Sequence, residues 1–412
     1  MVADGDIEAR NVAAAVARSS YGKLVAYLAA HTRDVAAAED ALSEAFAAAL
    51  EAWPVGGCPA NPEAWLLTVA RRRSIDVARR RRKGEAIAMQ LRTLLDELAQ
   101  SDAEVPDRRL ALLFACAHPA LDAAIRAPLI LQVVLGLDAV AIAAAFLTSP
   151  AAMSKRLVRA KQKIRSAGIP FEVPDRDEWP ARLDAVLDAI YAAFAEGWTD
   201  PGGTDVARRD LTDEAIYLAR LLVELLPNEP EALGLLALML HAHARRHARR
   251  DVAGRYVPLA EQDTTRWDAA LIDDAEAALA RASALGTIGR YQLEAALQSA
   301  HAHRCRTGAD NWTVVVQFYD ALLALTESPV VALNRAIAIA HRDGPAAALE
   351  TLDQLANETA LAQYQPYWAA RAELLAGAGA SDEARHAYDI AIGLERDDAV
   401  RAFLRRRRAA VR

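Results

Sequence analysis

The amino-acid sequence predicts an all-α protein. Alanine and leucine dominate the chain, and apolar residues recur at the spacing of helices rather than with the alternation of strands. Apolar residues make up 53% of the 412 residues, which is enough to form substantial hydrophobic cores. A chain of this length is expected to fold into two or three domains.

Charge is distributed unevenly along the chain and predicts a domain boundary. The net charge is −7. Residues 1–170 hold 22 basic and 18 acidic side chains, whereas residues 171–412 hold 26 and 37, and all five lysines lie in the first part. Two prolines, Pro170 and Pro174, mark the change in composition. We therefore expect a boundary near 170–180 between a basic part and an acidic part.

The composition also argues against several classes of protein. No apolar run approaches the ~18 residues of a membrane helix, and the first residues carry no basic leader, so we expect no membrane partner. The three cysteines, Cys58, Cys116 and Cys305, are far apart and form no Cys-x-x-Cys pair. This pattern predicts reduced thiols in a cytoplasmic protein and no zinc ribbon.

Two helices are expected at the start of the chain. The first covers 8–30 and the second covers 33–53, with Leu42 and Phe46 on the apolar face of the second. The other face of the second helix is acidic and carries Glu39, Asp40, Glu44 and Glu51. Such a face is either ordinary solvated surface or a docking surface for a basic partner helix.

The stretch 61–83 combines a packed helix with a dense run of arginines. Asn61 suits the N-cap position, and Trp65 begins an apolar stripe. Residues 71–83 contain eight Arg or Lys side chains and one acid, Asp76. Because the run continues a helix anchored in a core, we expect these arginines to contact nucleic acid rather than to form a merely solvated face.

A linker and a helix-turn-helix are expected next. Residues 84–108 end in an acidic stretch and suggest a linker with one short helix, near 88–99. The unit 109–168 closes with a helix that Ser149 can cap, and residues 149–165 hold six basic side chains and no acid. A strongly basic second helix of this kind is suited to the major groove of DNA.

These features together resemble a known family, the extracytoplasmic-function (ECF) sigma factors of bacterial RNA polymerase. The likeness to sigma region 2 rests on Ala38-Glu39-Asp40, Glu44-Ala45-Phe46, the Trp53-Pro54 loop, Asn61-Pro62-x-Ala64-Trp65-Leu66 and the arginine run. The helix-turn-helix that follows resembles sigma region 4. The resemblance implies region 2 at 1–83, an acidic linker at 84–108 and region 4 at 109–168.

The resemblance also implies roles for individual residues. Docking on core RNA polymerase is assigned to Glu39, Asp40, Glu44 and Phe46. Capture of a flipped base of the minus-ten element by the loop 54–61, and contact of the melted strand by the arginine helix, are assigned to Trp53, Asn61, Arg71, Arg72, Arg73, Asp76, Arg79 and Arg80. Reading of the minus-thirty-five element is assigned to Ser149, Ser154, Lys155, Arg156, Arg159, Lys163 and Arg165.

Residues 178–412 are expected to form a long helical extension. Helix pairs are predicted at 213–226 with 229–244, 290–306 with 311–326, 328–343 with 346–355, and 367–376 with 381–394. Ala348 and Ala384 correspond at a spacing close to the ~34 residues of tetratricopeptide (TPR) repeats, which predicts a TPR-like α-solenoid. The extension resembles that of one ECF subgroup, which implies a regulatory domain with a protein or a ligand as its partner.

No enzyme, metal or cofactor is expected. His243 and His247 lie four residues apart on one helix face, but the neighbouring Arg245 and Arg246 repel a cation. The glycine-rich loop 196–203 lacks the lysine of a phosphate-binding loop. No arrangement of catalytic side chains stands out.

The favoured hypothesis is an ECF sigma factor whose partners are core RNA polymerase and promoter DNA. The alternative is a TPR-bearing helix-turn-helix regulator that acts on duplex DNA without being a sigma subunit. That alternative predicts tight promoter binding in the absence of polymerase. A third class, a metal hydrolase built on the helical extension, predicts stoichiometric bound metal.

Overall fold

The computed structural model describes residues 2–80, 106–146, 148–175, 178–198, 206–355 and 359–411. Its regular elements are helices, so the predicted all-α fold is confirmed. Within the described residues, extended pairing is limited to one isolated bridge, between Arg250 and Tyr256. The short helix predicted near 88–99 lies outside the described residues, as does most of the predicted linker.

The backbone divides into two compact units. The first unit comprises residues 1–200 and 205–215, and the second comprises 201–204 and 216–412. The helix that opens the predicted extension, α9 (Trp179–Trp198), packs on the helices of the first unit. The division therefore falls later than the predicted boundary near 170–180.

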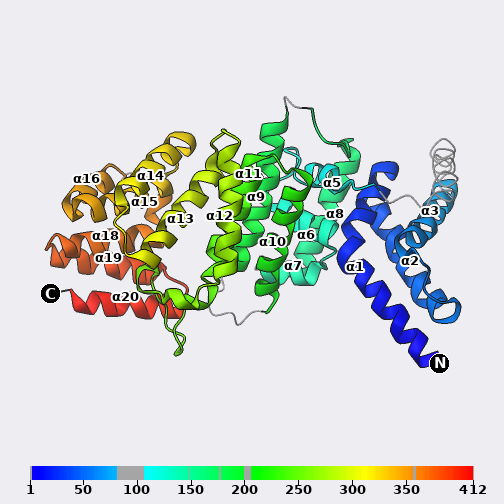
Figure 1. Ribbon diagram of the computed structural model, residues 1–412, viewed down its shortest axis with the longest axis horizontal. Coiled ribbons are helices and arrows are strands. Elements are labelled where there is room, and N and C mark those ends of the chain that lie inside the picture. Colours follow the sequence, from blue (N-terminus) through cyan, green and yellow to red (C-terminus); the bar gives the residue numbers. More distant parts are fainter. Residues whose placement is uncertain are drawn as a thin grey trace. The chain divides into compact units, whose positions relative to one another are not determined.

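The first unit is built from eight helices and the start of a ninth within the described residues (Figure 1). They are α1 (Val2–Thr32), α2 (Val35–Gly56), α3 (Pro62–Arg80), α5 (Arg109–Cys116), α6 (Ala123–Leu135), α7 (Ala139–Ala145), α8 (Pro150–Ser166), α9 and the first half of α10 (Val206–Leu225). Helices α1, α2 and α3 pack on one another, and α6, α7 and α8 form a second group of mutually packed helices, which includes the predicted helix-turn-helix. The ring of Trp179 in α9 lies 5.5 Å from that of Phe114 in α5.

Helices α1 and α6 approach so closely that only glycine fits between them. A Cβ atom at Gly22 would lie 2.2 Å from the carbonyl oxygen of Val134, which is backbone and cannot move aside cheaply. Gly136, which ends α6 with a φ of 74°, would place a Cβ 3.0 Å from the ring of Tyr21. The helix group that opens the chain and the helix-turn-helix group are thus in direct contact within the first unit.

The predicted helix caps are confirmed. The Asn61 side chain accepts a hydrogen bond from the backbone N–H of Ala64 at 3.1 Å, next to the start of α3. The Ser149 hydroxyl accepts one from the N–H of Ala152 at 3.2 Å, and Pro150 occupies the first turn of α8. Both caps satisfy N–H groups that have no partner within the helix, and they fix where the two basic helices begin.

The second unit is a succession of helices, most of which pack against a neighbour in the chain (Figure 1). Its described elements are the end of α10, α11 (Pro230–Ala244), the short helices η1 (Arg246–Ala248), η2 (Leu259–Glu261) and η3 (Thr264–Arg266), α12 (Ala269–Ala284), α13 (Arg290–Thr307), α14 (Trp312–Thr326), α15 (Pro329–Asp343), α16 (Pro345–Gln354), α17 (Thr359–Ala362), α18 (Gln365–Gly377), α19 (Ser381–Leu394) and α20 (Asp398–Ala410).

The predicted helix pairs of this unit match observed helices closely. The pair 290–306 with 311–326 corresponds to α13 and α14, and the pair 367–376 with 381–394 corresponds to α18 and α19. The first predicted pair is represented by α10 and α11, although α10 begins earlier than expected. Buried apolar side chains of α13–α18 form one continuous core, and a further core joins α18, α19 and α20.

Candidate nucleic-acid interface

The acidic face of α2 is divided between solvent and the interior. Asp40 is exposed, and the Glu44 side chain is 57% exposed. Phe46 is half-buried beside Leu50, which is 46% exposed. Glu39 differs, because its side chain is only 12% exposed. The predicted docking set therefore comprises two accessible carboxylates, an apolar contact and one covered carboxylate.

Glu39 is covered because it pairs with Lys161 of α8. The two charged atoms lie 2.5 Å apart, and each side chain is 12% exposed. Burial raises the pKa of the Glu39 carboxyl, and Lys161 opposes this rise. A second ion pair joins the same two helices, at 3.0 Å between Arg165 and Asp34. The basic helix of the helix-turn-helix is thereby held against the helix that carries the predicted docking face.

The buried carboxylate of Glu39 acts on its surroundings. Burial raises the pKa of the Tyr21 hydroxyl and of the Cys116 thiol, and the Glu39 charge raises both further. Both groups are therefore neutral near pH 7. Cys116 thus behaves as a small core residue, as its position in the apolar helix α5 indicates.

The arginines of α3 do not share one environment. Arg72 and Arg73 are exposed, and Arg73 lies 3.4 Å from Glu44 of α2 in a solvent-exposed ion pair. Arg71 is only 2% exposed; its guanidinium donates to the Tyr27 hydroxyl and lies 4.7 Å from the centre of the Tyr27 ring. Arg71 is therefore not accessible to DNA in this structure, because its position in the helix turns it toward α1.

Trp53 is also part of the core. It is 3% exposed, and its ring meets that of Trp65 edge-on at 5.4 Å. In this structure the Trp53 ring is thus not accessible to a DNA base. Asn61 lies exposed between Trp53 and the start of α3, where it caps the helix. Val55, in the turn that ends α2, is 91% exposed.

Part of the predicted minus-ten set lies outside the described side chains. The backbone of α3 is helical through Asp76, Arg79 and Arg80, but the described side chains of the helix end at Ile75. The last residues of the arginine run, 81–83, lie outside the described residues.

Helix α8 presents its basic side chains in two directions. One face of the helix is buried in the core of the first unit and carries Met153, Leu157, Ala160 and Ile164. The side chains exposed to solvent on the other face, and at the cap, are Ser149, Ser154, Lys155, Arg159 and Lys163. Arg156 is half-buried and donates to the backbone carbonyl of Ala124 in α6 at 3.3 Å. Lys161 and Arg165, four residues apart, point instead to α2.

Among its described side chains, the first unit thus carries two exposed cationic surfaces on separate helices. One consists of Arg72 and Arg73, beside the loop that follows α2. The other consists of Lys155, Arg159 and Lys163 of α8. Guanidinium and ammonium groups on ordered helices are suited to phosphate contact, and arginine also suits base edges.

Several partners of these residues had no clear signal in the sequence. Tyr27 accepts the hydrogen bond from Arg71, and Asp34 pairs with Arg165. Lys161 belongs to the basic run of α8 but was not among the predicted site residues. A helical-wheel comparison could have separated Lys161 and Arg165 from the outer stripe, but their acidic partners lie more than a hundred residues away in the chain.

None of the described helices is long and apolar enough to cross a membrane. Among the described side chains, no group of three or more His, Cys, Asp and Glu residues is placed to hold a metal ion.

Comparison with known proteins shows which family the chain belongs to. The family described as Sigma-70 region 2 matches residues 16–84, which include α2, α3 and the second half of α1, and the Family of unknown function (DUF6596) matches residues 182–283. "Uncharacterized protein R00370" of Rhizobium meliloti (strain 1021) is 41% identical over 382 residues, which cover 90% of this chain and 89% of that protein. No solved structure matches the chain. The chain therefore belongs to the same family as this rhizobial protein, and it carries a sigma-70 region 2 domain followed by a domain of unknown function.

Proposed function

We propose that the protein is an ECF-type sigma factor that binds core RNA polymerase and directs transcription from specific promoters. The observation that carries this proposal is the sigma-70 region 2 match, because it covers an acidic helix followed by a capped cationic helix. Sigma factors of this kind are not enzymes, and we propose no catalytic role for this chain.

Polymerase docking is proposed for the exposed part of the α2 face. Asp40 and Glu44 present carboxylates to solvent, and Phe46 and Leu50 add partly exposed apolar surface close by. Charged groups at the rim steer association, while apolar contacts supply binding energy. The exposed pair between Glu44 and Arg73 contributes little to stability and can open at low cost when a basic partner helix approaches.

Promoter contact is proposed for the two exposed cationic surfaces. Arg72 and Arg73 are proposed to meet the melted minus-ten strand, with Asn61 at the adjacent loop. Lys155, Arg159 and Lys163 of α8, with the neighbouring Ser149 and Ser154, are proposed to meet duplex DNA at the minus-thirty-five element. Arg71 and Trp53 have a packing role in this scheme, because both are buried.

The ion pairs between α2 and α8 give the proposal a further consequence. Lys161 and Arg165 engage Glu39 and Asp34, so part of the basic charge of α8 is neutralised within the first unit. If polymerase also engages Glu39, the buried acid of the same face, it competes with α8 for that carboxylate. Docking and release of the second DNA-binding helix are then coupled events.

The helical second unit is proposed to regulate this activity. Its successive packed helices support a TPR-like, solenoid architecture, which offers extended surfaces for a partner. The sequence of α18 and α19, two antiparallel helices joined by a short turn at Gly379, is typical of such a repeat. The match to a family of unknown function assigns no partner to this region.

The docking proposal is tested by charge reversal on α2. The double variant Asp40→Lys with Glu44→Lys places two cations on the proposed docking face and is expected to reduce the affinity for core polymerase at least tenfold. Affinity is measured by fluorescence anisotropy of the labelled protein with purified core enzyme. Asp273→Lys is the matched control, because Asp273 is an exposed acid on helix α12 of the second unit.

The outcome distinguishes a sigma factor from a helix-turn-helix regulator that acts without polymerase. Weaker polymerase binding in the α2 variant, with the Asp273→Lys protein unchanged, supports the sigma reading. Equal affinity in all three proteins contradicts the docking surface. Failure of the wild-type protein to bind core enzyme, together with tight binding to promoter duplex alone, supports a helix-turn-helix regulator instead.

A further inference from the structure

A hollow of about 830 Å³ lies within the second unit, and most of its wall is apolar. Helices α15, α18 and α20 contribute most of the wall, and the segment 256–261, which precedes α12, contributes another part. Ile337, Ala369 and Phe403 are typical of the apolar side chains that line it. The volume falls within the roughly 300–1,000 Å³ that is typical of small-molecule sites.

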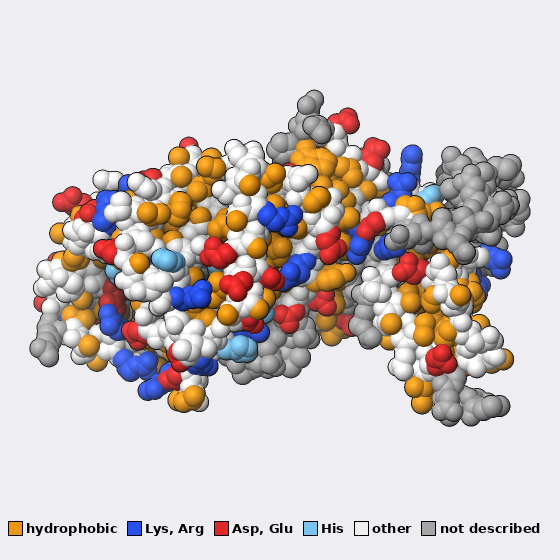
Figure 2. Space-filling model, in the orientation of Figure 1, with side chains coloured by type: hydrophobic (Ala, Val, Ile, Leu, Met, Phe, Trp, Pro, Cys, Tyr) orange, Lys and Arg blue, Asp and Glu red, His pale blue; other side chains and the backbone are white. Residues whose placement is uncertain are grey.

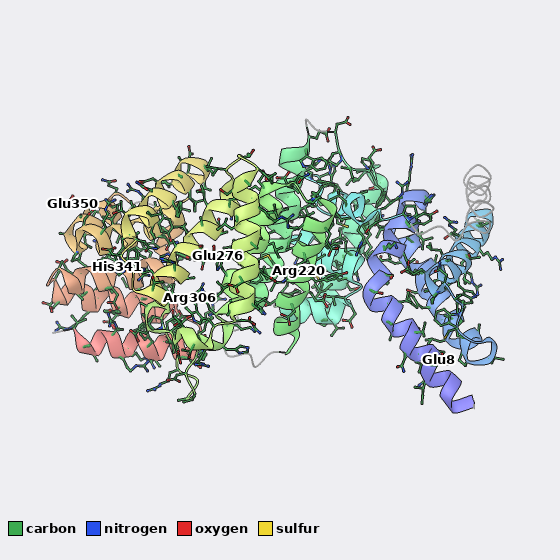
Figure 3. All side chains as sticks on the ribbon, viewed as in Figure 1. Glu8, Arg220, Glu276, Arg306, His341 and Glu350 are labelled. Carbon is green, nitrogen blue, oxygen red and sulfur yellow. The ribbon has the colours of Figure 1, made fainter. Side chains whose placement is uncertain are left out.

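The helices of the wall each present one face to the hollow. From α15 come Asn334, Ile337 and His341, which follow one another at intervals of three and four residues and therefore lie along one side of the helix. His341 is labelled in Figure 3. Helix α18 contributes Ala369 and Ala370, whose short side chains leave the space between the helices open.

The segment 256–261 is fastened to α20, so the hollow is a built feature of the fold. The ring of Tyr256 meets that of Phe403 in α20 edge-on at 5.4 Å. A few residues earlier in the chain, Arg250 pairs with Asp397 at 2.5 Å. Asp397 also accepts hydrogen bonds from two backbone N–H groups in the first turn of α20, which fixes where that helix begins.

The charged side chains of the wall leave no unpaired buried charge for a ligand. Glu373 of α18 accepts hydrogen bonds from Arg407 at 2.7 Å and from Tyr388 at 2.5 Å, so the arginine of the wall is already paired. Glu261 is exposed to solvent, as are the Arg side chains that gather around the loop between α11 and α12 (Figure 2). A charged ligand head would therefore give up its hydration for little return.

Three uncharged polar groups of the wall can instead receive a ligand. The side-chain amides of Asn334 and Gln365 are half-buried, and neither has a hydrogen-bond partner among the described residues. His341 stacks on Trp312 with the ring centres 4.0 Å apart, and burial lowers its pKa, so the imidazole is neutral near pH 7. An amide and a neutral imidazole each offer both a hydrogen-bond donor and an acceptor.

We propose that this hollow binds an uncharged amphipathic small molecule. The apolar body of the ligand lies against Ile337, Ala369 and Phe403, and a neutral head such as an amide exchanges hydrogen bonds with the wall amides of Asn334 and Gln365. A mostly apolar pocket with a few polar groups that fix orientation is the usual form of a small-molecule site. The site stands on the geometry of the second unit and does not depend on the proposed role in transcription.

The proposal is tested by calorimetry with probes that differ in the charge of the head. Decanamide, decanoate and decylammonium are titrated below their solubility and micelle limits into the full-length protein, without polymerase. One decanamide is expected to bind per chain, at least tenfold more tightly than either charged probe, because neither charge finds an unpaired buried partner in the wall. Octanamide is expected to bind roughly tenfold more weakly than decanamide, because it buries two fewer methylene groups.

Two sets of variants locate the bound decanamide. Ala369→Phe fills the hollow and is expected to abolish binding, whereas Ala277→Phe adds the same ring at an exposed position of α12 and is expected to leave it unchanged. Asn334→Leu with Gln365→Leu removes both wall amides at nearly constant volume and is expected to weaken decanamide roughly tenfold. Its control is Gln354→Leu, at an exposed position of α16.

Thermal melting of each variant reports whether the fold is retained. The double leucine variant adds no bulk to the hollow, so it tests the site even if Ala369→Phe fails to fold. Absence of saturable decanamide binding overturns the proposal, and so does binding that survives both sets of variants in folded protein. Equal or tighter binding of decanoate or decylammonium contradicts the assignment of an uncharged head.

Discussion

The ion pair between Glu39 and Lys161 gives the sharpest test of how the first unit is held together. Lys161→Ala removes one partner of a pair in which both side chains are 12% exposed. The Glu39 carboxylate is then left with no partner in a largely buried position. Removing one member of a buried pair costs about 3–5 kcal/mol, so we expect a loss of about 3 kcal/mol for this partly covered pair.

The loss is expected to depend on pH in a defined direction. Burial raises the pKa of Glu39 in the folded protein, and Lys161 opposes the rise. Without Lys161 the pKa rises further, so the folded state holds a proton that the unfolded chain releases. The stability of the variant then falls as the pH rises from the pKa of Glu39 in the unfolded chain through its higher pKa in the folded protein. The variant is therefore expected to lose the most stability, relative to the wild type, at about pH 8 and to lose less at about pH 5.

The measurement is hydrogen–deuterium exchange of α2 and α8 peptides as a function of urea, on the full chain. Lys155→Ala is the control, because Lys155 is an exposed cation on the same helix. Glu39→Leu combined with Lys161→Met replaces the pair by apolar groups and is expected to recover most of the lost stability. A loss below about 0.5 kcal/mol for Lys161→Ala, or a deficit that grows as pH falls, refutes the reasoning.

Three further predictions concern the first unit. Gly22→Ala places a Cβ 2.2 Å from the carbonyl oxygen of Val134, so it is expected to destabilise the unit by about 1–3 kcal/mol in urea denaturation, and wild-type stability would contradict the close packing of α1 and α6. Tyr27→Phe removes the hydroxyl that accepts a hydrogen bond from the buried arginine of α3, with an expected cost of about 1–3 kcal/mol in the same assay; no change would show that this arginine finds another partner. Arg72→Ala with Arg73→Ala is expected to reduce the salt dependence of holoenzyme binding to a single-stranded minus-ten oligonucleotide by roughly 1.4 in the logarithmic slope, and an unchanged slope would exclude both from phosphate contact.

The sequence was sufficient for the fold class and for most helices. Helix starts were well predicted where a capping side chain precedes the helix, as at Asn61 and Ser149, because capping is a local interaction. Apart from the start of α10, the helix pairs of the second unit were predicted within a few residues because each helix carries its own apolar spacing. The two compact units divide later than 170–180 because the packing of α9 on α5 and α6 is a tertiary contact that composition does not encode.

The candidate site was predicted less completely, for a related reason. A run of arginines gives the positions of the charges but not the direction in which each points, so Arg71 was placed with its exposed neighbours although it lies against Tyr27. Trp53 was misplaced in the same way, because an aromatic residue beside a loop serves the core or a base equally well. The pair between Glu39 and Lys161 joins residues far apart in the chain, and no local pattern reveals it.

Run-off transcription with purified core polymerase tests the central claim most directly. Full-length protein and core enzyme are combined with a genomic promoter library, and transcripts are sequenced. The proposed function predicts transcripts that require both components and share sequence motifs upstream of their starts. If none appears with the full-length protein or with a fragment that ends at Trp198 and so retains α9, while the full-length protein alone binds duplex DNA, the sigma-factor proposal is contradicted.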